Sequence, residues 1–161
     1  MLTARTAVVA VLFLACACSR PSPPAPASHE SLGNVMVQVG RRFELAGRAA
    51  DANRFELAEF EAGELGEVFE NDVPNAELPK EGPTAQIPAL AKAFLETNAP
   101  ELQKAAAAKD RAAFAAAFQH AASACNACHQ ASEKAFIQVP SVPGKPVPEV
   151  DPLPAPPAAA H

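Results

Sequence analysis

The chain has 161 residues, enough for one domain or a small pair of domains. Hydrophobic residues make up 49% of it and aromatic residues only 6%, and alanine supplies most of the apolar share, which favours closely packed helices over sheets. The net charge of −5 argues against binding to nucleic acid or to an anionic membrane surface.

Residues 1–17 have the layout of a secretory signal peptide. One basic residue, Arg5, precedes an apolar run that is too short to span a bilayer, which takes about 20 residues. A cysteine that follows a small residue is typical of a bacterial lipoprotein signal, so Cys18 is the candidate for lipidation and Cys16 is the alternative. Cleavage without lipidation also fits this stretch. In either case we expect an exported, periplasmic protein, and lipidation would anchor it to the membrane.

Proline-rich segments flank the middle of the chain. Residues 18–28 are typical of an extended linker, and residues 139–161 are typical of an extended tail. Valines recur among the tail prolines, so we expect the first part of the tail to lie along the folded domain. The sequence therefore predicts a folded domain over residues 29–138.

The first half of this domain shows two helical patterns. Apolar residues recur at steps of three and four over residues 30–49 and again over residues 55–70, which is the spacing of one buried helix face. The predicted buried positions are Leu32, Val35, Val39, Phe43, Ala46 and Ala50 in the first helix and Ala58, Ala62, Leu65 and Phe69 in the second. Prolines and glycine over residues 71–83 predict a long loop after them.

The second half predicts two more helices. A third helix begins near Thr84, and we expect Pro100 to interrupt it, with Asn98 capping a new segment. Asp110 is a good N-cap for a fourth helix over residues 111–137. The chain is therefore predicted to be all-α, an antiparallel four-helix bundle.

The fourth helix carries Cys125-Asn126-Ala127-Cys128-His129, which has the C-x-x-C-H spacing of c-type haem attachment. The two thiols would bond to the two vinyl groups of one haem, and the histidine would ligate its iron. Positions three and four residues apart share a helix face, so this set can meet one ring. A zinc site would need a second ligand pair, and a thioredoxin-like redox pair would need a preceding strand. We expect one covalent haem c, with Cys125 and Cys128 binding it and His129 as the proximal iron ligand.

The last part of the domain resembles the last helical hairpin of the class II c-type cytochromes, the cytochrome c′ family. The resemblance rests on an Ala-rich helix and an Asp turn over residues 102–110, followed by Phe114, Phe118 and the C-x-x-C-H motif. The resemblance extends over residues 30–137. The chain departs from the family after the histidine, where the family often has a Tyr-Arg or similar basic pair and this chain has Gln130-Ala131-Ser132. The proline-rich tail is a second departure.

The resemblance implies that the first helix covers the other face of the haem. Low-spin members place a methionine there, whereas cytochromes c′ place an apolar residue that leaves the iron open. Met36 is the one methionine beyond the signal peptide, and Met36–Gly40 is similar to the family's first-helix segment, so Met36 is the candidate distal ligand. The alternative is that Met36 fills space in the core. His29 and His120 are weaker candidates.

These features predict a monohaem cytochrome that carries single electrons between redox partner proteins. The alternative is a five-coordinate haem protein that binds nitric oxide or carbon monoxide, as a likeness to cytochromes c′ implies. We expect no enzyme, because the chain has no Ser/His/Asp arrangement, no H-E-x-x-H and no phosphate loop, and a peroxidase would want a distal acid–base group. The resemblance is also compatible with a homodimer formed through the first two helices.

Two charged features have two interpretations each. One of Arg41, Arg42 and Arg48 would pair with the haem propionates, or the three would form a solvated helix face balanced by the acidic second helix. The acidic run from Glu56 to Asp72 would be either a solvated face or a surface that attracts a basic redox partner.

Overall fold

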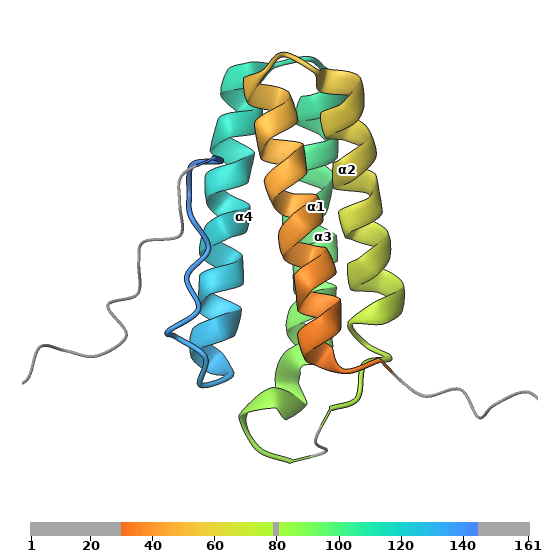
Figure 1. Cartoon of the computed structure of the whole chain (residues 1–161), viewed down its shortest axis with the longest axis vertical. Coiled ribbons are helices and arrows are strands. Elements are labelled where there is room, and N and C mark those ends of the chain that lie inside the picture. The colour runs from red at the N-terminus through yellow and green to blue at the C-terminus, as the bar shows by residue number, and fades with distance from the viewer. Residues whose placement is uncertain (1–29, 79–80, 145–161) are drawn as a thin grey trace, which may run out of the picture.

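The computed structural model describes residues 30–78 and 81–144. The predicted signal peptide, both candidate lipidation cysteines, the linker, His29 and the end of the tail lie outside these residues. Four helices stand side by side as a bundle (Figure 1). They are α1 (Leu32–Asp51), α2 (Phe55–Glu67), α3 (Ile87–Ala107) and α4 (Arg111–Ala131). No β-strand forms in the described part of the chain, so the all-helical class and the four predicted helices are confirmed.

The predicted buried faces of α1 and α2 are confirmed. Every predicted position on these two faces is buried, except Leu32, which is half-buried and packs against the core. Ser31 begins α1 as its N-cap, with Oγ 3.4 Å from the Asn34 amide. After α2 the chain widens into a π-helical turn, Val68–Asp72, and Phe69 of this turn lies inside the bundle, where its ring stacks on Phe94 with centroids 4.2 Å apart.

The predicted interruption at Pro100 is wrong. A short 3-10 turn, Pro83–Gln86, leads into α3, and α3 then runs through Pro100 as one helix. Proline removes one hydrogen bond, the one that Glu96 would have accepted. Both Pro100 and Glu96 are exposed, so water can satisfy the freed carbonyl. The helix therefore survives the proline, and Asn98 lies inside α3 instead of capping a new segment.

The fourth helix begins as predicted and ends earlier than predicted. Asp110 is its N-cap, and Oδ1 accepts a hydrogen bond of 2.9 Å from the Ala113 amide. The helix ends at Ala131 and not at Ile137, because Glu133 adopts a left-handed conformation with φ of 58°. The Lys134 amide there bonds back to the His129 carbonyl at 2.7 Å, which closes the helix end.

Beyond this turn the chain runs back along α4 (Figure 1). We call residues 137–144 the return segment. Val139 packs against the core beside α4, and the Gly144 amide donates a 2.8 Å hydrogen bond to Glu44 of α1. The expectation that the first part of the tail lies along the domain is therefore confirmed for the described residues of the tail.

The helices do not pack equally tightly on one another. Contacts are extensive between α1 and α2, between α2 and α3, and between α3 and α4, and they are fewest between α1 and α4. One contact across that last interface is a stack of Phe43 on Phe118, with ring centroids 4.0 Å apart. In the described residues, no helix is both long enough and apolar enough to cross a membrane.

Gly47 of α1 is expected to matter for stability, because its lack of a side chain makes room for this stack and for the return segment. A Cβ there would lie 2.5 Å from the Phe118 ring and 2.7 Å from Pro143. We expect Gly47→Ala to lower the free energy of unfolding by roughly 1–3 kcal/mol, through overpacking, in a urea titration. Gly40→Ala is the matched control, since no atom lies within 4 Å of a Cβ there, and it should stabilise α1 by roughly 0.5–1 kcal/mol. Equal effects of the two substitutions would contradict this account.

Candidate functional site

The C-x-x-C-H motif occupies the last two turns of α4. Cys125, Cys128 and His129 are separated by three and four residues, so the helix brings them to one side. All three are half-buried, and both cysteines are free thiols. The motif residues predicted to act together therefore lie together, at the end of the bundle where α1 begins (Figure 1).

The His129 ring is held by a backbone group. Its Nδ1 lies 2.9 Å from the carbonyl oxygen of Ile137 in the return segment. A carbonyl only accepts, so Nδ1 carries the proton in this contact and Nε2 is left with a lone pair. Histidines that ligate metals almost always donate the other ring N–H in this way, which fixes both tautomer and orientation.

Burial keeps the thiols of the motif protonated in the chain without haem. It raises the pKa of the Cys125 thiol to about 12, and the nearby Cys128 adds to this effect. Burial also raises the pKa of the Cys128 thiol, and the hydroxyl of Ser132 lowers it in part. The two cysteines are therefore chemically unequal, with Cys125 the more deeply shielded.

Asn126, one of the two variable positions of the motif, ties the return segment to α4. Its Nδ2 donates to the Val139 carbonyl at 3.0 Å, and its Oδ1 accepts from the Val139 amide at 2.7 Å. Sequence reasoning did not single out Asn126 or the Ile137 carbonyl. The only indication in the sequence was that an Asn side chain can bond to both backbone groups of one residue. The sequence does not indicate which residue that would be.

Met36 lies in the second turn of α1, half-buried and packed against the core. Because α1 begins at the end of the bundle where α4 terminates, Met36 and the motif belong to the same half of the molecule (Figure 1). This position is compatible with both interpretations of Met36, as a distal ligand and as a packing residue.

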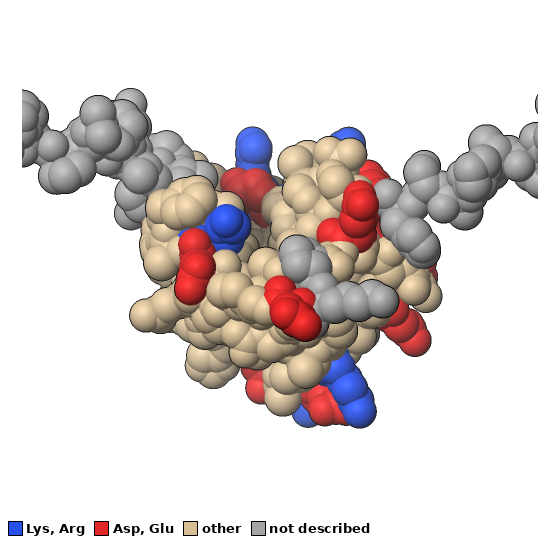
Figure 2. All heavy atoms as spheres, turned by 90° about the horizontal axis from the view of Figure 1, so that it is seen from below, with Lys and Arg blue, Asp and Glu red and all other residues tan. Residues whose placement is uncertain are grey.

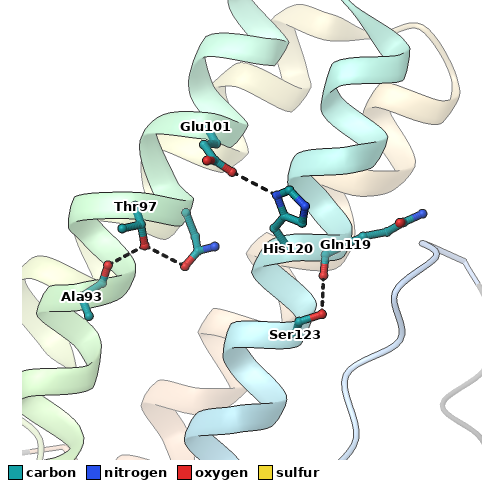
Figure 3. A network of polar contacts seen from close by, with 7 residues as sticks. Ala93, Thr97, Glu101, Gln119, His120 and Ser123 are labelled. Carbon is teal, nitrogen blue, oxygen red and sulfur yellow. Dashed lines mark hydrogen bonds and ion pairs between the residues drawn. The ribbon is translucent and has the colours of Figure 1, made fainter.

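His120 lies on a different part of α4 and points to α3. Its Nδ1 is 3.4 Å from Glu101 of α3, and 69% of its side chain is exposed (Figure 3). On the same stretch of α3, Thr97 bonds back to the Ala93 carbonyl at 2.7 Å. The structure thus places His120 on the surface between α3 and α4, away from the side of α4 that carries the motif.

The arginines and the acidic run of the first two helices are partly paired with each other. Arg42 donates to Glu61 and to Glu64 of α2, each at 2.9 Å, whereas Arg41 and Arg48 are exposed. Glu61 is almost fully buried by this contact. Of the two interpretations of Arg42, the structure supports pairing with the acidic helix.

Figure 2 views the end of the bundle that carries the motif, where acidic and basic side chains are scattered among uncharged ones. The turn after α4 exposes two large apolar side chains there, Phe136 and Ile137, with 62% and 45% of their surface accessible. Exposed apolar residues beside a functional group are typical of a surface that meets another protein.

Comparison with known proteins gives no match: no protein-family model, no curated protein and no solved structure is similar to this chain. Across residues 30–78 and 81–144, no group of three or more His, Cys, Asp or Glu side chains is arranged to hold a metal ion.

We predict that Cys125 reacts slowly with iodoacetamide in the folded chain without haem. A rise of its pKa from 9.0 to about 12 cuts the thiolate fraction at neutral pH roughly a thousandfold, and the greater nucleophilicity of a more basic thiolate recovers part of this, for a net slowing of about thirtyfold. The rate should rise with pH until the pH approaches 12. Site-resolved mass spectrometry, with the urea-unfolded chain as reference, measures it.

Cys128 is the internal control for this experiment. It should react faster than Cys125, because burial shields it less. Equal rates for both cysteines in folded and unfolded protein would show that the helix does not shield them.

Proposed function

We propose that the chain is a monohaem c-type cytochrome of the class II kind, an antiparallel four-helix bundle that carries single electrons between redox partner proteins. The observation that supports this most strongly is the state of His129. It follows two free thiols on one side of α4, and its Nδ1 is committed to the Ile137 carbonyl, so that Nε2 is the nitrogen available to a metal.

The donor set fits one covalently bound haem c. Cys125 and Cys128 would hold the porphyrin through thioether bonds, and His129 would be the proximal ligand of the iron. The bound haem would supply one-electron exchange between its ferric and ferrous states. The chain would contribute an imidazole held by the Ile137 carbonyl and the frame of the helix bundle. In haem c the thiols bond to the porphyrin and only the histidine nitrogen ligates the iron. The two thiols and His129 therefore need not be arranged around one metal ion.

The other face of the haem would be covered by α1. Support comes from the packing, since the interface between α1 and α4 is the least extensive in the bundle and is where a planar group would disturb the fewest contacts. Met36 lies in the half of α1 nearest the motif, and its thioether would serve as the sixth ligand. A methionine there would favour a low-spin carrier with a raised reduction potential.

Electrons would pass through the end of the bundle that carries the motif. Phe136 and Ile137 are exposed there, close along the chain to His129. Glu59, Glu67 and Glu70 of the acidic run are exposed on the α2 side and add negative charge that would attract a basic partner.

We further propose that the protein is exported to the periplasm and anchored by lipid on Cys18, with Cys16 as the alternative. This proposal is supported by the sequence alone. The linker over residues 18–28 would then separate the haem domain from the membrane and let it reach more than one partner.

The first test is covalent haem. Protein made with a c-type maturation system should retain one haem per chain through denaturing electrophoresis, detected by haem staining and by mass. Cys125→Ala combined with Cys128→Ala should remove it completely, because both thioether bonds are lost. His129→Ala should keep the haem attached and change the visible spectrum.

Ser123→Ala is the control on the same helix, since Ser123 bonds only to the backbone one turn earlier, and it should change neither property. Purified protein that contains zinc and no iron would overturn the proposed function.

Met36 separates the electron carrier from the gas-binding alternative, in which Met36 would only pack against the core. If Met36 is the distal ligand, the ferric protein should show the weak long-wavelength band of iron–thioether bonding. Met36→Leu should abolish this band, open the iron to carbon monoxide and lower the reduction potential.

Val37→Leu, at the exposed neighbouring position, is the control and should change none of these properties. A wild-type protein that is already high-spin, binds carbon monoxide rapidly and is unaffected by Met36→Leu would place the gas-binding function first.

A further inference from the structure

The Ile137 carbonyl that accepts the His129 proton lies on a part of the chain with little burial to hold it. Phe136 and Ile137 are both exposed, and Gln138 is exposed as well. A loop of this kind moves readily unless hydrogen bonds fix it. The position of the carbonyl must therefore depend on the polar contacts on either side of it.

On the side towards α4, the contact is local. The Ile137 amide donates to the Lys134 carbonyl at 2.8 Å, and this bond closes a turn within the loop itself. It shapes the turn, but both of its partners belong to the same exposed loop. The Lys134 amide in turn bonds to the His129 carbonyl at 2.7 Å, so the start of the loop is tied to the helix end. Ile137 lies three residues further on, and the contact that holds its other side is the one described next.

On the other side, the contact is to α4. Asn126 bonds to both backbone groups of Val139, two residues after Ile137, at 2.7 and 3.0 Å. Asn126 and His129 are three residues apart on the same rigid helix. The two hydrogen bonds therefore hold the return segment in a fixed position relative to the His129 ring.

We propose that Asn126 is a positioning residue for the iron ligand: by clamping Val139 to α4, it holds the Ile137 carbonyl where it accepts the His129 Nδ1–H. This inference rests on the proposed function. Donating this hydrogen bond to the Ile137 carbonyl makes the imidazole a stronger electron donor to iron. A stronger donor stabilises ferric iron and lowers the reduction potential. One of the two variable positions of the motif thus tunes the haem without touching it.

Two independent substitutions break the clamp. Asn126→Ala removes both hydrogen bonds from the helix side. Val139→Pro leaves Asn126 in place and removes the amide that donates to its Oδ1. Gln130→Ala is the matched control, because Gln130 is an exposed amide side chain on α4 next to His129.

The measurements are the reduction potential of the haem-loaded full chain and the hydrogen-exchange rate of the His129 Nδ1–H, followed by NMR. Both clamp variants should raise the potential, on the order of a tenfold shift of the equilibrium towards ferrous iron, or about 59 mV for one electron. Both should also speed exchange of the ring proton at least about tenfold. The double variant should do no more than Asn126→Ala alone, since the two residues act through one contact.

The outcomes separate the two proposals. A wild-type chain that takes up no covalent haem overturns the proposed function. A chain that takes up haem, but whose potential and ring-proton exchange match the control in both clamp variants, overturns the role of Asn126 and leaves the cytochrome intact. Additive effects in the double variant would also overturn it, because they would mean that the two residues act separately.

Discussion

The end of α4 at Ala131 is the constraint on which the candidate site depends. Had the helix continued to Ile137, eight residues of helix would carry that carbonyl about 12 Å along the axis from His129. The left-handed conformation of Glu133 reverses the chain instead, and the carbonyl comes to 2.9 Å from the ring. One strained residue just beyond the helix thus converts a motif of three side chains into a site with a defined histidine tautomer.

Small residues determine how the rest of the bundle accommodates this reversal. The return segment lies over the interface between α1 and α4, and Gly47 leaves the space in which Pro143 and the Phe118 ring meet. A larger residue at Gly47 would push the return segment outwards or separate Phe43 from Phe118. The Ala-rich composition, which first indicated closely packed helices, is thus joined by a glycine at the one position where a layer of extended chain lies over them.

Periodicity in the sequence was enough to predict the four helices and the buried faces of the first two, because these depend on burial at regular intervals. The Asp110 cap followed from its residue type at a helix start. The motif was recognised from its spacing alone. The continuity of α3 through Pro100 could not be predicted, since it depends on whether water reaches the carbonyl of Glu96. The roles of Ile137 and Asn126 could not be predicted either. Any residue can supply a backbone carbonyl, so the sequence does not identify the one that contacts His129. Apolar residues continue the pattern of α4 beyond Ala131, so the sequence did not indicate where the helix ends.

The position of α1 is set more by α2 than by α4. Arg42 joins α1 to Glu61 and Glu64 through a partly buried ion pair, and removing one partner of such a pair leaves a costly uncompensated charge. α2 in turn packs on α3, and α3 on α4, so the spacing between α1 and α4 depends on these three more extensive interfaces as well as on the stack of Phe43 on Phe118. In the proposed cytochrome, this arrangement would let the interface between α1 and α4 adapt to the haem while the other three interfaces stay intact.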